Sequence, residues 1–431
     1  MELTLTILGA GNRGMHAYSE IAKRADIPFK IIAVADPDER RCRKMQQEHG
    51  ISESNIFMEW KEALAGPRLS DAVIVATPDN EHVECAIAAL KKGYHVLLEK
   101  PMARTAEDCN KIISAQEESG KVLLVAHVLR YTRFFSKLKD IISSGKLGQI
   151  VDMNLSENIC YWHFAHSYVR GNWRRTSDSG PLVLTKSCHD IDILSWLMEA
   201  DVESVYSTGA LNFFNKDNAP EGSAPSCTDE CRVKGRCIFD ADKIYLSKEI
   251  IDWPANVVSP TDTTLEGVKK ALKTSQYGRC VFNCDNDVCD TQNVTLAFNG
   301  NKFATLQING HSADFTRKIQ VNCTHGQVTG DLYANSMRIT TKTGNLKQGD
   351  LQEEESFDMG TGKHAGGDYF LMKEFADAIL DDKTDLNHTT ARNSLMSHII
   401  AFAAEESRKT GNPIHPRYID TNIPCIPKKE I

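Results

Sequence analysis

The chain has 431 residues, 41% of them hydrophobic and 25% charged, which is enough for two domains with separate cores. Its net charge of -8 argues against a nucleic-acid partner, because nucleic acids attract basic surfaces. No run approaches the roughly 18 apolar residues of a membrane span, and the first residues lack a secretory signal. We therefore expect a cytoplasmic protein with no membrane partner.

The first elements predict a dinucleotide-binding unit. Residues 3–8 have the pattern of a short buried strand, the sequence GAGNRG follows at 9–14, and residues 15–24 predict a helix. In such a turn one glycine permits a tight bend, the second lets the backbone approach a pyrophosphate, and the third lets helix and strand pack closely. The expected cofactor-binding residues here are Gly9, Gly11, Asn12, Arg13 and Gly14.

The second predicted strand, residues 29–35, ends in Asp36. An acidic residue at this position can accept hydrogen bonds from the ribose hydroxyls of adenosine, which favours NAD. Arg40 and Arg41 lie close by and could hold a 2′-phosphate, so NADP is the less favoured alternative.

Strands and helices continue to alternate along the chain. Residues 71–76, 94–98 and 122–126 predict strands, and residues 81–91 predict a helix, so we expect a doubly wound parallel sheet. The strand at 94–98 ends in Glu99, Lys100 and Pro101. A lysine at this end of the sheet can hydrogen-bond a substrate hydroxyl and stabilise its developing alkoxide. The alternative is a surface lysine at a turn.

Four motifs resemble the Gfo/Idh/MocA family (glucose–fructose oxidoreductase and inositol dehydrogenase) in their order and spacing. They are GAGNRG at 9–14, ATPDNEH at 76–82, EKPMA at 99–103 and HDIDILSWL at 189–197. The resemblance is strong over residues 1–200 and looser beyond. It implies an NAD-binding Rossmann domain over 1–128 and a substrate-binding α/β domain over 129–431, with an open, mainly antiparallel sheet that often builds dimers or tetramers. We also expect cofactor contacts from Thr77, Pro78, His82, Glu99 and Lys100.

The resemblance further implies that Lys100 and His189 are catalytic. Imidazole titrates near neutrality, so His189 can take the hydroxyl proton during hydride transfer. The alternative is a capping or core histidine. Many family members carry Asp four residues before this histidine, whereas here that residue is Thr185 and Lys186 follows it. The usual relay of lysine, aspartate and histidine is therefore incomplete, and Lys186 is an additional charge.

Residues 161–175, YWHFAHSYVRGNWRR, combine aromatic and polar side chains. Aromatic faces stack on sugar rings while His, Asn and Arg bond hydroxyls, so this stretch predicts a carbohydrate site. The alternative is an ordinary loop between domains. The expected substrate-binding residues are His127, Arg130, Tyr131, Trp162, His163, His166, Arg170, Trp173, Arg174, Lys186 and His189.

Alternating patterns in the second domain predict strands at 149–155, 202–208, 293–298, 302–308, 318–323 and 336–341. Helices are expected at 369–380 and 391–410, followed by a surface tail over 411–431. His364 and Asp368 precede the first of these helices and could reach the same crevice.

An insertion at about 215–290 is rich in cysteine, with Cys227-x3-Cys231-x5-Cys237 and Cys280-x3-Cys284-x4-Cys289. In a cytosolic protein such cysteines indicate thiols or metal ligands rather than disulfides. A segment without its own core can be ordered by tetrahedral zinc. The expected structural zinc ligands are Cys227, Cys231, Cys237 and Cys280, with Cys284 as an alternative fourth. Free thiols or another metal centre are the other interpretations.

The sequence therefore predicts an NAD-dependent oxidoreductase that transfers hydride between nicotinamide and a secondary alcohol of a sugar, glycoside or polyol, and forms a homodimer or homotetramer. A second hypothesis is a glycoside-cleaving hydrolase or lyase that keeps NAD bound and uses transient oxidation, elimination and reduction. A third is a non-catalytic NAD-binding sensor, although a sensor would not need Lys100 and His189.

Overall fold

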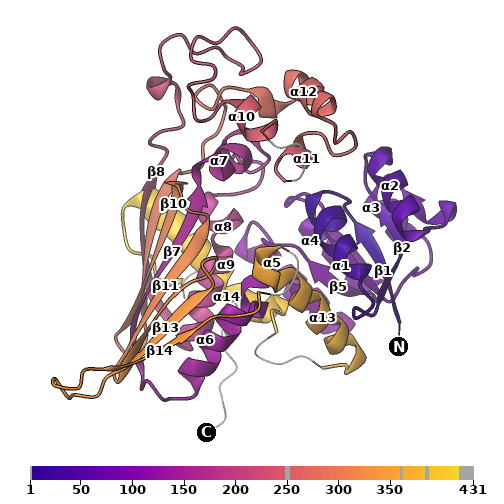
Figure 1. The fold of residues 1–431 in the computed structure, drawn as a ribbon. Coiled ribbons are helices and arrows are strands. Elements are labelled where there is room, and N and C mark those ends of the chain that lie inside the picture. The colour runs from indigo at the N-terminus through magenta and orange to yellow at the C-terminus, as the bar shows by residue number, and fades with distance from the viewer. Residues whose placement is uncertain (1, 248–252, 360–362, 384–387, 417–431) are drawn as a thin grey trace.

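The computed structural model describes residues 2–247, 253–359, 363–383 and 388–416 and contains two sheets (Figure 1). Sheet A has six parallel strands in the order β3-β2-β1-β4-β5-β6. Sheet B has eight strands in the order β14-β13-β12-β11-β7-β10-β9-β8. This confirms the expected Rossmann sheet followed by an α/β domain with a mainly antiparallel sheet.

Sheet A is built from short, almost wholly buried strands, as expected for a parallel sheet covered on both faces. Its strands are β1 (Leu3–Leu8), β2 (Phe29–Ala35), β3 (Ile56–Phe57), β4 (Ala72–Val75), β5 (His95–Leu98) and β6 (Leu123–Val125). The helical segments between them are η1 (Gly14–Ser19), α1 (Glu20–Ala22), α2 (Glu39–His49), η2 (Glu53–Asn55), α3 (Trp60–Ala65), α4 (His82–Lys91) and α5 (Ala106–Ser119).

Two helices from the C-terminal part of the chain complete the core around sheet A. Leu371 and Phe375 of α13 (Gly367–Leu380) pack into the cluster that contains Leu5 and Ile31. Leu395 of α14 (Ala391–Thr410) joins the cluster on the other face. A sheet that is buried on both faces requires such cover, so the last helices pack on the first domain.

Sheet B is formed by β7 (Ile150–Cys160), β8 (Val202–Ala210), β9 (Thr291–Phe298), β10 (Lys302–Ser312), β11 (Thr316–Cys323), β12 (Gly326–Asp331), β13 (Ser336–Thr341) and β14 (Leu351–Glu355). Strands β7 and β10 pair in parallel, while the other neighbours are antiparallel. Strands β12 and β14 were not predicted.

One face of sheet B packs against helices, and the other is open (Figure 1). The covering helices are α6 (Arg133–Ser143), α9 (Cys188–Met198) and the second half of α14. The open face holds a shallow groove of about 950 Å³ lined by polar side chains such as Asn154, Thr305 and Gln307. Ile414 forms a β-bridge with Val205 at the sheet edge, and the predicted surface tail beyond residue 416 lies outside the described residues.

Short helical segments lie near the junction of the two sheets and in the insertion. They are η3 (Val128–Tyr131), α7 (Tyr161–Phe164), η4 (Ala165–Arg170), α8 (Leu182–Thr185), η5 (Lys216–Asn218), α10 (Ala241–Tyr245), α11 (Ala255–Val258), α12 (Leu265–Thr274), η6 (Gln276–Gly278) and η7 (His364–Gly366). Helices α10 and α12 lie above α7 in the view of Figure 1, and α11 lies to its right. None of the helices in the described ranges is long and apolar enough to cross a membrane.

The insertion has a small apolar core of its own, which corrects the premise of the zinc prediction. This core contains Tyr245, Val268, Leu272 and Tyr277. Within the described residues, no three His, Cys, Asp or Glu side chains are arranged to hold a metal ion.

The predicted zinc ligands make other contacts. Cys227 Sγ accepts a hydrogen bond from Arg170 at 3.4 Å, and Cys237 Sγ accepts the Phe239 N–H at 3.4 Å. Cys284 Sγ donates to a backbone carbonyl at 3.3 Å. Cys231 and Cys280 are not in disulfides. Cys227, Cys231, Cys237 and Cys280 line one small cavity, but their present arrangement does not support the zinc prediction.

Candidate active site

The glycine loop after β1 has the close contacts that the sequence predicts. Gly9 has a φ of +98°, and a Cβ there would lie 2.4 Å from the Ala76 carbonyl oxygen. A Cβ at Gly14 would lie 2.0 Å from the Gly9 carbonyl oxygen, whereas one at Gly11 would meet nothing within 4 Å. The loop is therefore packed against the end of β4 while open space remains beside Gly11, which fits a bound pyrophosphate.

Two further features of this edge fit a dinucleotide. Asp36 is buried at the end of β2, where its carboxylate accepts the Ala10 N–H at 2.8 Å and the Asp38 N–H at 2.9 Å. Arg41 lies 3.6 Å from this carboxylate. The Thr77 hydroxyl follows β4, just before Pro78, and is buried without a hydrogen-bond partner within the described part of the chain. The Asp36 carboxylate and the Thr77 hydroxyl therefore both lie near the glycine loop.

Other predicted cofactor residues are held by the protein itself. Arg13 forms ion pairs with Glu99 and, at 2.6 Å, with Asp368. The two ring nitrogens of His82 lie 2.8 Å from the Pro101 carbonyl oxygen and 3.0 Å from that of Thr77. These contacts join strand ends and α13, and the expected cofactor role of both side chains stays a prediction. Asn12 Oδ1 accepts a hydrogen bond from Lys363 at 3.0 Å.

Lys100 and His189 come near each other where the carboxyl end of sheet A contacts α8 and the start of α9, and the charge of Lys100 acts on the His189 imidazole. Lys100 follows β5, and its ammonium donates to the Thr185 carbonyl oxygen at 2.6 Å. His189 lies in the first turn of α9 and is buried. The Thr185 hydroxyl donates within its own helix, to the Pro181 carbonyl oxygen at 3.2 Å. A backbone carbonyl at this position therefore anchors the lysine, where many family members have a carboxylate.

His189 is suited to accept a proton. Burial lowers the pKa of its imidazole well below the ordinary value, and the charge of Lys100 lowers it further. The ring is therefore neutral near pH 7, and its Nδ1 has no hydrogen-bond partner among the residues described. A neutral imidazole beside an ammonium can take a hydroxyl proton while the ammonium stabilises the oxygen.

The polar side chains behind this pair form a buried support. His127 is fully buried and packs edge-on against His189, with 5.7 Å between ring centroids. Lys186 pairs with Glu157 at 3.1 Å, and the guanidinium of Arg317 lies 2.8 Å from the same carboxylate. Lys186 therefore joins a charge network, and His127 contacts the catalytic histidine from behind.

Aromatic side chains form a wall beside the crevice. The Lys100 ammonium lies 5.8 Å from the centroid of the Trp173 ring, whose N–H donates to Asp79 at 3.0 Å. His163 lies 4.8 Å from Trp253 and 5.2 Å from Phe315 between ring centroids. Trp162 also packs on Trp253, at 5.3 Å. This arrangement keeps His163, Trp162 and Trp173 as candidate substrate contacts.

Three predicted substrate residues are almost fully buried and contact other parts of the protein. His166 lies 3.1 Å from the Tyr245 hydroxyl, and Arg170 donates to the Arg279 carbonyl oxygen at 2.7 Å. Both contacts hold the insertion. Arg130 forms a bidentate ion pair with Asp192, with both hydrogen bonds at 2.6 Å. These contacts do not test the expectation that His166, Arg170 and Arg130 bind substrate, which stays a prediction. The hydroxyl of Tyr131, another predicted substrate residue, lies 3.0 Å from the hydroxyl of Thr389.

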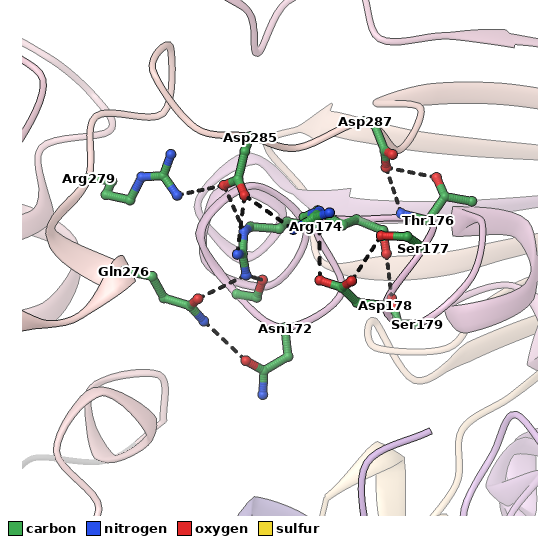
Figure 2. Close-up of polar contacts among 12 residues, drawn as sticks. Asn172, Arg174, Thr176, Ser177, Asp178, Ser179, Gln276, Arg279, Asp285 and Asp287 are labelled. Atoms are coloured by element: carbon green, nitrogen blue, oxygen red, sulfur yellow. Dashed lines mark hydrogen bonds and ion pairs between the residues drawn. The ribbon is translucent and has the colours of Figure 1, made fainter. Parts of the chain in front are cut away.

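Figure 2 shows how the insertion holds the segment that carries Trp173. Arg174 donates to Asp285 at 2.9 Å, and Arg279 pairs with the same carboxylate. Asp287 accepts the Thr176 N–H at 2.6 Å and its hydroxyl at 2.7 Å. Arg174 therefore links two surface segments and does not face the crevice.

Sequence reasoning missed several residues of this site. Asp79 lies in the 76–82 motif, so its place beside β4 gave a signal that it could face the crevice. Trp253 and Phe315 come from the insertion and from the turn after β10, and no local pattern marks either one. Glu157 and Arg317 lie on β7 and β11, which only the strand pairing brings together.

Both halves of the chain match models of one oxidoreductase family. Residues 3–127 match its NAD-binding Rossmann fold, and residues 139–415 match its C-terminal alpha/beta domain. The chain belongs to this Gfo/Idh/MocA oxidoreductase family. The predicted resemblance is confirmed, as is the assignment of the first domain to an NAD-binding Rossmann fold.

Relatives of this oxidoreductase include the protein YteT of Bacillus subtilis (strain 168), which is 28% identical over 74% of each chain. The inositol 2-dehydrogenase of Rubrobacter xylanophilus is 29% identical over 48% of this chain and 55% of its own length. The 2,7-anhydro-N-acetylneuraminate hydratase of Escherichia coli (strain K12) is 29% identical over 42% of this chain and 46% of its own length. The alignment thus spans about half of the last two proteins.

The fold is also that of solved structures. An oxidoreductase from Agrobacterium radiobacter, in complex with NAD+, L-tartaric acid and magnesium, superposes with a TM-score of 0.68 at 14% identity. The match covers 96% of this chain and 99% of that one. At this identity the likeness establishes the shared fold.

Proposed function

We propose that this oxidoreductase is an NAD-dependent dehydrogenase that acts on a secondary alcohol of a sugar, glycoside or polyol. The observation that carries the proposal is that the Thr185 carbonyl holds the Lys100 ammonium, at 2.6 Å, close enough to the buried His189 for its charge to act on that imidazole. The inositol 2-dehydrogenase relative and the NAD+ complex of the Agrobacterium oxidoreductase support the proposed substrate class and cofactor. NAD is favoured over NADP because the buried Asp36 carboxylate would repel a 2′-phosphate.

NAD, when bound, supplies the hydride acceptor at nicotinamide C4. The glycine loop, Asp36 and Thr77 would hold it. His189 accepts the proton of the substrate hydroxyl, because its imidazole is neutral near pH 7. The Lys100 ammonium spends one N–H on the Thr185 carbonyl, which leaves its other N–H groups for the substrate oxygen as negative charge develops there.

The test is NADH formation with purified protein, NAD+ and a panel of inositols, hexoses and methyl glycosides. Lys100→Met and His189→Asn should each lower kcat by about 100-fold or more, since each removes one part of the proton transfer. Lys61→Met is the matched control, because Lys61 has a side chain that is 64% exposed. The absence of both NAD binding and turnover in the wild-type protein would contradict the proposal.

A second candidate function is the internal cycle of oxidation, elimination and reduction with NAD kept bound. The hydratase relative supports this second candidate, since the name of that protein describes the addition of water. The two functions differ in their products. A dehydrogenase accumulates NADH with a ketone, whereas the internal cycle leaves NAD+ and yields cleaved, dehydrated or hydrated sugar that mass spectrometry detects.

We also propose that the protein is a homodimer or homotetramer formed through the open face of sheet B. Phe303, which is 50% exposed, lies on the same side of β10 as Thr305 and Gln307 of the polar groove. This face could pack against the same face of a second copy of the chain. Light scattering should give a multiple of the 48.0 kDa chain mass, and Phe303→Glu should shift it toward the monomer. A monomeric wild-type protein at micromolar concentration would rule this out.

A further inference from the structure

A second histidine lies at the crevice, and the proposed hydride transfer does not use it. His364 Nδ1 lies 3.0 Å from the Asp368 carboxylate. The His364 ring lies near that of His189, with 6.3 Å between the centroids and 48° between the ring planes. At this separation the two imidazoles cannot hydrogen-bond each other, so His364 is not a further link in the proton path of His189.

The carboxylate behind His364 is firmly held. Asp368 is fully buried in the first turn of α13, and Arg13 donates to both of its oxygens, at 2.6 and 3.1 Å. Burial alone would raise the pKa of Asp368, but the charges of Arg13 and His364 and their hydrogen bonds lower it. Asp368 therefore stays ionised, and it fixes the His364 ring with Nδ1 as the N–H donor. The proton-accepting nitrogen of neutral His364 is then Nε2.

The backbone at this point is also unusual. His364 and the following Ala365 both have positive φ angles, 51° and 53°, which side-chain-bearing residues rarely adopt. Such conformations persist where surrounding contacts impose them, and they concentrate at functional sites. The side chain of His364 is 34% exposed although its partner Asp368 is 0% exposed. A buried carboxylate thus presents a partly open imidazole to the crevice.

The two crevice histidines have different surroundings. His189 has no partner for Nδ1 within the described ranges and stands beside the Lys100 ammonium, while His364 has a carboxylate partner. Burial lowers the pKa of both imidazoles, so each is a neutral base near pH 7, and their different partners orient them separately. The two imidazoles are tilted by 48° with their centroids 6.3 Å apart, so neighbouring atoms of one ligand could contact both rings.

We propose that His364, oriented by Asp368, is a second acid–base residue that moves a proton at the carbon next to the oxidised carbinol carbon. This inference rests on the proposed function, since oxidation to a ketone is what makes that neighbouring C–H acidic. The substrate class is then a sugar or polyol with a hydrogen on the adjacent carbon. If the next carbon carries an oxygen substituent, the site can also eliminate it.

The proton and electron transfers balance without another reactant. Nε2 of His364 takes the proton from the adjacent carbon, and the C–H electron pair becomes the C=C bond of an enolate. The carbonyl π pair moves to oxygen, where the Lys100 ammonium stabilises the negative charge. The His364 imidazolium can then return its proton to carbon. In an elimination the enolate instead re-forms its carbonyl, its C=C pair makes a double bond to the next carbon, and the C–O pair leaves with the oxygen, which takes the proton from His364.

The test measures deuterium uptake and hydride transfer in the same reaction. Wild-type protein is incubated in D2O with NAD+ and the sugar of the panel that forms NADH, and mass spectrometry locates deuterium on carbon. The variant is His364→Asn, because asparagine tolerates positive φ and can still donate to Asp368 but is no base. His325→Asn is the matched control, since His325 is exposed in the turn after β11, which pairs with the start of β7.

We expect enzyme-dependent deuterium on the carbon next to the carbonyl, with His364→Asn lowering the uptake at least about 100-fold. The ratio of deuterium uptake to NADH formation should therefore fall at least about 20-fold in this variant relative to wild type. NADH formation without enzyme-dependent deuterium would overturn the inference and leave the dehydrogenase intact. Equal uptake in His364→Asn, or equal losses of uptake and hydride transfer, would also overturn it. No hydride transfer in the wild-type protein would overturn the proposed function and this inference together.

Discussion

Different forces hold the glycine loop after β1 and the cysteine-rich insertion over residues 215–290. Backbone contacts fix the loop: a Cβ at Gly14 would lie 2.0 Å from a neighbouring carbonyl oxygen. Side chains fix the insertion, through a small apolar core and polar contacts such as those of Asp285 with Arg174 and Arg279 (Figure 2). A backbone constraint needs specific residue types at fixed spacing, so the sequence displays it. Side-chain anchors from distant segments leave no such pattern.

The largest effect should come from the loop. Gly14→Ala should cost more than about 4 kcal/mol of folding free energy, because the methyl group cannot avoid backbone atoms. Gly11→Ala should leave the melting temperature nearly unchanged but abolish NAD binding, since its Cβ would enter open space beside the loop. Thermal unfolding and NAD titration of both variants check this. Equal melting temperatures would show that the loop is not fixed by backbone contact.

Lowering the pH should destabilise the packing of the insertion. Burial, followed by the charge of Arg170, lowers the pKa of His166 from 6.5 to about 3. The folded protein therefore resists protonation of this ring, so stability is lost as the pH falls from about 6.5 toward 3. At pH 5 the expected loss is about 2 kcal/mol.

Melting temperatures at pH 7 and pH 5 measure this effect. His166→Phe keeps a ring against Tyr277 but removes the titrating group, so its melting temperature should fall less on acidification. In hydrogen-exchange measurements at falling pH, peptides of the insertion should lose protection before peptides of β1 and β5. An identical pH dependence in the variant would exclude His166 as the acid-sensitive group.

A smaller effect is expected from the ion pairs shown in Figure 2. The Asp285 side chain is 42% exposed, and such pairs contribute about 0–1 kcal/mol to stability. Asp285→Asn should therefore leave the melting temperature within about two degrees of wild type, but it should raise KM about fivefold by loosening the segment around Trp173. Steady-state kinetics with the active sugar test it. A fall in kcat with KM unchanged would contradict a role in substrate positioning.

The smallest effect should come from chelation. If an apolar core holds the insertion, 1,10-phenanthroline should leave the melting temperature unchanged, and metal analysis should find no stoichiometric zinc. Stoichiometric zinc whose removal lowers the melting temperature would restore the original prediction and show that side-chain packing alone does not hold this region.

Much of the first domain was predictable because its constraints are local. The boundaries of β1 and β2 match the predicted strands, and the residues of the glycine loop have the contacts expected of them. The second domain was less so. Strands β12 and β14 were missed, and His166 and Arg170 proved to be anchors for the insertion. An aromatic and basic stretch has the same composition whether it binds a sugar or packs against protein.

The sequence by itself determined the parallel sheet, the glycine loop, and the places of Lys100 and His189 at element ends, since hydrophobic periodicity and backbone sterics act over a few residues. Only the tertiary structure decided what surrounds them. It brought the Thr185 carbonyl to Lys100, Asp368 to His364, and α13 and α14 back onto sheet A. These contacts join residues that are far apart in the sequence and that only long-range packing brings together, so no local pattern could have predicted them.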